Sequence, residues 1–169
     1  MPDNGMDFFV RTASERDLPA VRALLVQTWH DTYDPIYGRE RVVEITDSWH
    51  SLDALSARLK RPHSEFVVAD SGQRIGGMAF AAAGDDGKKI QLHQLYVHPE
   101  CQGRGIGVAL FSEIAQCFPE AREITIEVEE ANSRARAFYE HLGFEEVGRS
   151  GDCGGAGFEL PALIYRRGL

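Results

Sequence analysis

Long apolar runs and paired cysteines are both absent from this sequence of 169 residues. No apolar run approaches the ~18 residues that a membrane-spanning helix needs, so no membrane contact is expected. The three cysteines, Cys101, Cys117 and Cys153, form no Cys-x-x-Cys pair, and their odd count predicts neither a disulfide framework nor a zinc site. The first five residues lack the basic and apolar regions of a signal peptide. We therefore expect a soluble, cytoplasmic protein that holds no metal.

Positive charge is also scarce. Acidic residues outnumber basic residues by 26 to 18, which gives a formal net charge of −8. Proteins that bind nucleic acids or anionic membranes draw much of their affinity from a basic surface, so neither partner is expected here. Hydrophobic residues make up 43% and charged residues 26%, as in an ordinary globular chain. The length suits one domain that buries its core without disulfides or metal.

The spacing of apolar residues predicts a mixed α/β fold. Helical spacing covers 18–29, 42–59, 106–117 and 135–142, with a loop at 33–38 after the first helix and a candidate break near Ser51 in the second. Strand patterns cover 8–10, 66–69, 75–83, 90–97, 124–128, 144–147 and 162–165. The residues Gly84-Asp85-Asp86-Gly87 give a strong hairpin signal. The strand–helix–strand crossover through 106–117 implies one parallel strand pair in an otherwise antiparallel sheet.

A glycine-rich turn, Gln102-Gly103-Arg104-Gly105-Ile106-Gly107, lies between a predicted strand and a predicted helix. N–H groups at a helix N-terminus lack helical partners and carry the positive end of the dipole, and glycine lets the backbone approach phosphate oxygens. Two other phosphate motifs fail. No Gly-Lys-Ser/Thr follows, as a Walker loop requires, and Val108 and Leu110 stand where a dinucleotide fingerprint needs glycine. The turn is either another kind of anion site or a plain flexible connection.

Two motifs resemble those of GNAT (Gcn5-related) N-acetyltransferases. The segment Leu95-Tyr96-Val97-His98-Pro99, followed by the turn at 102–107, is similar to the family's strand and its Gln/Arg-x-x-Gly-x-Gly/Ala signature. The segment 132–144, Asn-Ser-Arg-Ala-Arg-Ala-Phe-Tyr-Glu-His-Leu-Gly-Phe, looks like the family's Asn-x-x-Ala-x-x-Phe-Tyr-x-x-x-Gly-Phe. The order of elements agrees over nearly the whole chain, although the N-terminal third matches in pattern only.

This resemblance implies a GNAT-like single domain over 1–169, with a mostly antiparallel twisted sheet, one parallel splayed strand pair and flanking helices. Residues 8–64 would form the first strand and the acceptor-side helices, 65–130 the cofactor-binding core, and 131–169 the last helix and strands. Homodimers are common in such families, so a homodimer is an open expectation, although no residue here specifies an interface.

The resemblance also implies acetyl-CoA as cosubstrate, without a metal. Main-chain groups of Leu95 and Val97, with Tyr96 between them, would hydrogen-bond the pantetheine arm. Asn132, Phe138 and Tyr139 would contact the cofactor where the parallel strands splay apart. The pyrophosphate would be held by the turn, that is by Gln102, Gly103, Arg104, Gly105, Ile106 and Gly107.

Acetyl transfer to an amine needs an oxyanion donor and a proton for the departing thiolate. The N–H of Val97 is our candidate for the donor. Tyr139 matches the family's usual tyrosine acid, and a phenol with a pKa near ~10 can protonate a thiolate when the two are held close. The alternative for Tyr139 is a helix aromatic packed in the core beside Phe138.

The general base is less clearly marked. Many relatives place a glutamate on the strand before the signature, but this sequence has Gln91, His93 and Gln94 there. Along a regular strand Gln91 and His93 share one face with Leu95 and Val97, so His93 would point to the cofactor side and accept the proton. Otherwise His93 is structural, with His98 a weaker candidate, or the amine binds already deprotonated.

Substrate recognition would fall to the region before residue 65. Trp29, Tyr33 and Tyr37 lie near Asp31 and Asp34 around the break between helices, where rings and carboxylates can hold an organic cation. With His93 these rings are the candidate substrate-binding residues. The alternative is that the rings anchor a loop and the acids face solvent.

Two other segments carry weaker signals. Glu40, Glu44 and Asp47 share a helix face that is better explained as solvated. The glycine-rich stretch 151–157 reads as a mobile hairpin loop that either borders the acceptor cleft or only connects strands, and Cys153 within it has no basic partner that argues for a reactive thiolate.

The leading hypothesis is therefore an N-acetyltransferase that acts on a primary amine, with a small-molecule acceptor slightly preferred over protein N-termini or lysines. A non-catalytic acyl-CoA-binding or regulatory module of the same fold is the alternative from another class. Turnover with any amine separates the two.

Overall fold

The computed structural model describes residues 7–84, 86–150 and 160–169. Within these ranges seven strands form one sheet in the order β1-β2-β3-β4-β5-β7-β6. The strands are β1 (Phe9–Thr12), β2 (Ser64–Asp70), β3 (Ile75–Ala83), β4 (Lys89–Val97), β5 (Glu123–Glu129), β6 (Glu145–Ser150) and β7 (Ala162–Gly168). The helices are α1 (Leu18–Tyr37), α2 (Arg39–Trp49), α3 (Leu52–Lys60), α4 (Ile106–Cys117) and α5 (Ser133–His141), with 3-10 turns at Glu15–Asp17 and Pro99–Cys101. All strand pairs are antiparallel except β4 with β5, which confirms the predicted mixed fold.

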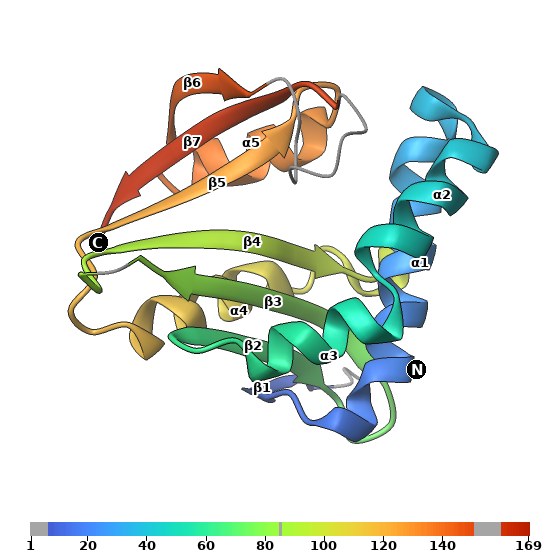
Figure 1. Cartoon of the computed structure of the whole chain (residues 1–169), viewed down its shortest axis with the longest axis horizontal. Coiled ribbons are helices and arrows are strands. Elements are labelled where there is room, and N and C mark those ends of the chain that lie inside the picture. The colour runs from blue at the N-terminus through green and yellow to red at the C-terminus, as the bar shows by residue number, and fades with distance from the viewer. Residues whose placement is uncertain (1–6, 85, 151–159) are drawn as a thin grey trace.

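The sheet opens between its two parallel strands. Strands β4 and β5 pair only at their beginnings, where Lys89, Ile90 and Gln91 face Glu123, Ile124 and Thr125. Beyond this point β4 pairs with β3 alone, and β5 pairs with β7. Figure 1 shows the two strands diverging toward α1 and α2. Among the described residues, this splay leaves the end of β4 without a neighbouring strand on one edge.

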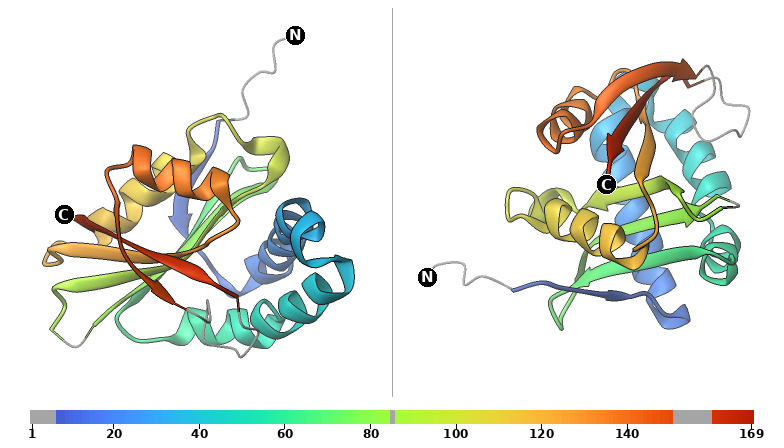
Figure 2. Two further views of the ribbon diagram at one scale, coloured as in Figure 1. Left: turned by 90° about the horizontal axis from the view of Figure 1, so that it is seen from above. Right: turned by 90° about the vertical axis from the view of Figure 1, so that its left-hand side faces the viewer.

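Helices cover the sheet on both faces. Figure 2 shows α1, α2 and α3 on one face and α4 and α5 on the other. Alternating side chains of β2 and β3 divide accordingly: Val67 and Ala79 join the core under α4, whereas Val68 and Met78 join the core under α1 and α3. The period of two along each strand therefore produces two separate cores.

The first helix is longer than the sequence predicts. We expected residues 33–38 to form a loop, but α1 continues as far as Tyr37 and contains Pro35. Proline removes one helical N–H, but this helix ends only at Gly38, whose φ of 86° suits glycine rather than an L side chain. Trp29 and Tyr33 are 3% and 4% exposed, in a cluster with residues of α2. Packing of this face outweighs the local loop signal.

The candidate break near Ser51 is confirmed. Ser51 lies between α2 and α3, and its Oγ accepts a hydrogen bond of 3.1 Å from the N–H of Ala54. A serine in this position satisfies one of the free N–H groups at a helix start. The α2–α3 junction that it fixes forms part of the site described next.

A β-bulge interrupts β4 and overturns one expectation. Leu92 lies opposite Ala81 and Gln94 opposite Phe80, so His93 is an extra residue without a partner in the register. Leu92, Leu95 and Val97 all contact the core under α4, while the His93 ring lies 5.6 Å from the Phe80 ring on the other face. The prediction that His93 shares a face with Leu95 and Val97 is therefore wrong. A bulge adds one residue and shifts the alternation of side chains, which no regular period can anticipate.

Candidate functional site

A pocket of about 1060 Å³ occupies the opening between β4 and β5. Its walls come from α1, the α2–α3 junction, β4, β5, the glycine-rich turn, the start of α4 and α5. Residues from both faces of the sheet therefore meet in one cavity, which is large enough for a cofactor segment together with a small acceptor.

The unpaired edge of β4 presents backbone groups to this pocket. The N–H of His98 donates to Gly76 O at 2.8 Å, so at this position the backbone faces β3. Because main-chain groups alternate in direction along a strand, those of Leu95 and Val97 face away from β3. The side-chain amide of Gln102 reaches Val97 O at 3.2 Å from that open side. An extended chain in the opening would find main-chain partners on β4.

The glycine-rich turn forms the N-terminus of α4. Gly103 and Gly105 both have a φ of +80°, a conformation that L side chains rarely adopt. Ala109 donates the first helical bond, to Gly105 O at 3.0 Å, so the N–H groups of residues 106–108 precede the helical ladder. No acidic side chain lies in the first turn of the helix. This end of α4 can hold an anion through backbone N–H groups.

Gly107 serves a different purpose from the other two glycines. A Cβ built there would lie 3.0 Å from Cε1 and Cζ of Phe138. The missing side chain therefore lets α5 approach the start of α4 closely. Phe138 lines the pocket at this contact.

Asn132 caps α5 and also joins it to α1. Its Oδ1 accepts from the N–H of Ala135 and its Nδ2 donates to the Tyr33 hydroxyl, both at 3.1 Å. Next to it, Arg134 contacts Gln102 Oε1 and lines the pocket, so α5 also reaches the turn before α4. Sequence analysis did not single out Arg134, although it lies inside the second motif.

Tyr139 lines the pocket from α5 and is 4% exposed. Its ring is held edge-on by Phe138 at 5.1 Å and Phe144 at 5.3 Å. Burial, and secondarily the nearby Tyr96 phenol, raises the pKa of Tyr139 well above its ordinary value. The phenol therefore stays protonated at physiological pH and is available as a proton donor.

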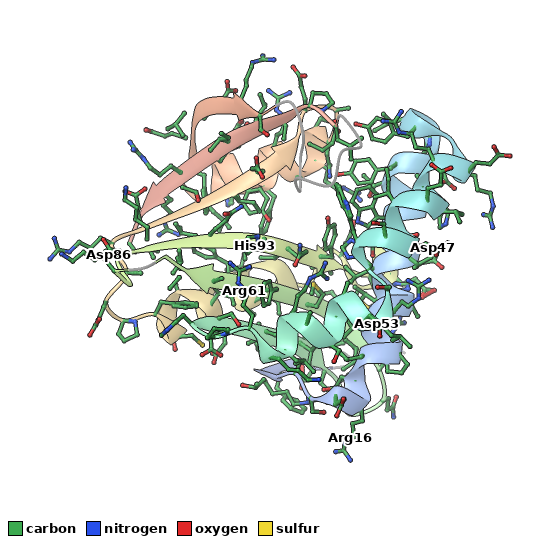
Figure 3. All side chains as sticks on the ribbon, viewed as in Figure 1. Arg16, Asp47, Asp53, Arg61, Asp86 and His93 are labelled. Atoms are coloured by element: carbon green, nitrogen blue, oxygen red, sulfur yellow. The ribbon has the colours of Figure 1, made fainter. Side chains whose placement is uncertain are left out.

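His93 also lines the pocket, but its charge environment opposes a role as general base. Burial, followed by the charges of Arg61 and Arg58, lowers the pKa of His93 to about 4. Figure 3 shows His93 on β4 beside Arg61, whose Nη1 lies 3.4 Å from His93 Nε2. A ring that is this hard to protonate is a weak proton acceptor at neutral pH.

The candidate substrate-binding aromatics divide into two groups. Trp29 and Tyr33 line the pocket, whereas Tyr37 is not among its lining residues and donates to Glu129 Oε1 at 2.5 Å. The neighbouring acids do not form a cation site with these rings. Asp31 is exposed and lies outside the pocket lining, and Asp34 accepts from His30 at 2.7 Å.

Sequence analysis assigned no role to two carboxylates of the site. Glu127 and Glu129 line the pocket from β5 and, unlike Ile126 and Val128, face away from the core under α4. Their signal was the alternation of acidic and apolar residues along β5. Alternation alone does not tell which side of the sheet faces an acceptor, so the sequence left both unassigned.

Several other expectations concern absent features. Within the described ranges no group of three or more His, Cys, Asp or Glu side chains is arranged to hold a metal ion. None of the helices described here is long and apolar enough to cross a bilayer. Cys101 and Cys117 are free thiols. The glycine-rich stretch 151–157, with Cys153, lies outside the described residues.

Comparisons with known proteins identify the family. Residues 21–144 match the model of the acetyltransferase (GNAT) family. The chain is 33% identical over 99 residues to N-alpha-acetyltransferase RimI of Mycobacterium tuberculosis, a match that covers 56% of this chain and 61% of that protein.

Solved structures share the fold at lower identity. A PaiA N-acetyltransferase from Thermoplasma acidophilum, in complex with coenzyme A, superposes with a TM-score of 0.83 at 21% identity, over 96% of this chain and 99% of that one. The ribosomal-protein-S18-alanine N-acetyltransferase of Escherichia coli gives a TM-score of 0.71 at 17% identity, over 96% and 94%. With the family match over residues 21–144, the chain belongs to the acetyltransferase (GNAT) family.

Proposed function

We propose that this GNAT acetyltransferase transfers the acetyl group of acetyl-CoA to a primary amine in the pocket between β4 and β5. The observation that carries the proposal is the splay itself. It joins an open strand edge, an anion-binding helix start and a buried phenol in one cavity. Acetyl-CoA supplies the acetyl group as a thioester. We further propose that residues 1–169 act as one domain.

The cofactor site, in this proposal, follows the backbone. Leu95 and Val97 offer main-chain groups to the pantetheine arm, and the N–H of Val97 polarises the thioester carbonyl. The turn at 102–107 holds the pyrophosphate through its N–H groups. The Arg134 guanidinium, which contacts Gln102 in this turn, adds positive charge near the phosphates.

Proton transfer is assigned to two walls of the pocket. Tyr139 donates the proton that the leaving thiol requires, since its raised pKa keeps the phenol protonated. For the base we favour Glu127 over His93. A carboxylate on the acceptor-facing side of β5 can accept the amine proton directly or through water, whereas burial and then two arginines oppose protonation of His93.

A small-molecule amine remains our preferred acceptor, because side chains of α1, α2 and α3 line the pocket on its acceptor side. The similarity to RimI, an N-alpha-acetyltransferase, supports a peptide N-terminus as the second candidate.

The test is acetyl-CoA-dependent thiol release by the purified protein with polyamines, amino sugars, amino acids, aromatic amines and N-terminal peptides. Acceptor-dependent release is expected. Acetyl-CoA binding without release on any amine would support the non-catalytic acyl-CoA-binding module, and a protein that does not bind acetyl-CoA would refute the cofactor site.

A further inference from the structure

The acceptor side of the pocket contains a partly buried cation that has no anionic neighbour among the described residues. Arg58 of α3 lines the pocket, with Nη2 donating to Trp49 O at 2.5 Å and Nη1 lying 3.3 Å from His50 Nδ1. Among the described residues Arg58 takes part in no ion pair. Burial lowers the pKa of Arg58 to about 10, so the guanidinium is still charged at neutral pH. A desolvated charge of this kind is costly unless a counter-charge meets it.

His50 adds a hydrogen-bond donor beside this cation. In the tautomer with the ring proton on Nε2, His50 Nδ1 accepts from the Arg58 guanidinium, which can only donate. His50 is 1% exposed, and burial with the charges of Arg58 and Arg22 lowers its pKa to about 3, so the ring is neutral. Its Nε2 is buried and finds no hydrogen-bond partner within the described part of the chain.

Trp29 provides a second buried donor of the same kind. Its ring lies 5.9 Å from that of His50, both residues line the pocket, and its Nε1 has no partner in the described ranges. A buried donor left without an acceptor is destabilising, and an acceptor group on a ligand would remove that cost. Two donors and one cation thus surround the same part of the pocket.

The acidic groups of the pocket lie on a different wall. Among the described lining residues, carboxylates come only from Glu127 and Glu129 on β5. Among the described lining residues on the α1–α3 side, Arg58 carries the only charged side chain. The pocket is therefore polarised, with anionic groups on one wall and cationic and N–H donor groups on another.

We infer that the acceptor amine carries a carboxylate, which Arg58 binds together with the N–H groups of His50 and Trp29. The amino group then lies toward β5, where Glu127 is the proposed base. This inference rests on the proposed acetyltransferase function and narrows its acceptor to amino acids and related amino carboxylates, or to peptides with a carboxylate near the N-terminus. Polyamines and amino sugars lack the group that this wall recognises.

The experiment compares matched acceptors in the thiol-release assay. Each set contains an amino acid, its carboxamide and its decarboxylated amine, and a parallel set contains peptides with acidic or neutral first residues. We expect kcat/KM to favour the carboxylate member by about tenfold or more, the value of a charge-assisted hydrogen bond. The amino acid and peptide sets show whether the carboxylate belongs to a free amino acid or to a peptide.

Variants assign the preference to Arg58. Arg58→Gln should raise KM for carboxylate acceptors about tenfold and leave the carboxamides within about threefold, with Arg58→Lys intermediate. Arg61→Gln is the matched control, since Arg61 is exposed and outside the pocket lining, and it should keep the preference. If Arg58 only holds the α2–α3 junction through Trp49 O, all acceptors would weaken together, and that result overturns the inference.

Binding separates this inference from the proposed function. Each acceptor set is also titrated by calorimetry into the CoA-saturated protein. Carboxylate-selective binding that Arg58→Gln abolishes supports the site even if no acetyl transfer occurs, in which case only the transferase assignment fails. If neutral amines are acetylated as efficiently as amino carboxylates, the proposed function stands and the carboxylate site is refuted. Binding without selectivity for carboxylates, or no carboxylate binding at all, also refutes the carboxylate site.

Discussion

Tyr139→Phe tests the proposed chemistry most directly, because it removes one oxygen and leaves the packing in place. The ring contacts with Phe138 at 5.1 Å and Phe144 at 5.3 Å involve the faces and edges of the ring rather than the hydroxyl. Phenylalanine keeps these contacts and the buried area. We therefore expect the free energy of unfolding to change by less than about 1 kcal/mol.

The effect on turnover should be much larger. A positioned general acid contributes about 100-fold or more to the rate, and a 100-fold loss of kcat equals about 2.7 kcal/mol of transition-state stabilisation. The dissociation constant of acetyl-CoA should stay within about twofold, since the proposed cofactor contacts are made by backbone groups of β4 and the turn. The expected pattern is a low kcat with unchanged cofactor binding and unchanged stability.

Three measurements check this pattern: steady-state thiol release, calorimetric titration of acetyl-CoA, and urea unfolding. Tyr96→Phe is the matched control, because Tyr96 is a second phenol that lines the pocket. Full activity of Tyr139→Phe would exclude Tyr139 as the acid. An equal loss in both variants would show that the effect comes from the pocket's polarity rather than from one donor.

Three further predictions follow from other contacts. Glu127→Gln should lower kcat/KM for the acceptor about 100-fold. His93→Gln should lower it by less than about threefold, because the pKa of His93 is already about 4. A larger loss for His93→Gln than for Glu127→Gln would restore His93 as the base. Asp17→Asn should cost about 2 kcal/mol of stability at pH 7, because Asp17 accepts two bonds from Arg11 at 2.8 and 2.9 Å that depress its carboxyl pKa. A carboxyl whose pKa is depressed by folding adds stability above its unfolded pKa of ~3.9, and this stability is lost as the pH falls below that value. Urea unfolding at successively lower pH should therefore show the difference in stability between the wild type and Asp17→Asn shrinking below about pH 4. A difference that stays constant would contradict the linkage. Gly107→Ala should destabilise the fold by about 1–2 kcal/mol because its Cβ would meet Phe138 at 3.0 Å, and an unchanged thermal midpoint would show that α5 yields freely.

Elements with a strong local period could be predicted from the sequence. β3 and α4 have the expected bounds, and the parallel pairing of β4 with β5 follows from the crossover through α4. Their apolar residues repeat at the period of the element, and two motifs place the turn at 102–107 between strand and helix. The resemblance to the GNAT family rests on the residues of these same two motifs.

Features that depend on distant contacts could not be predicted. Pro35 disfavours a helix locally, but the last turns of α1 form because Trp29 and Tyr33 are buried against α2. The contact of Arg58 with His50 joins α3 to the residue that follows α2, and it matters for function only because both side chains are buried in the pocket wall. The sequence shows Glu127 as one of the acidic residues that alternate along β5. It does not show which side of β5 faces the acceptor, because that depends on where α1 lies.

The bulge at His93 has a consequence for how the pocket can change. A regular strand offers every second side chain to each side of a sheet, but β4 offers two consecutive ones, His93 and Gln94, to the acceptor side. Leu92 and Leu95 on either side stay in the core under α4. Stability and acceptor choice thus depend on separate positions of one nine-residue strand. New acceptors could be selected by varying the polar positions while the apolar ones continue to hold the sheet together.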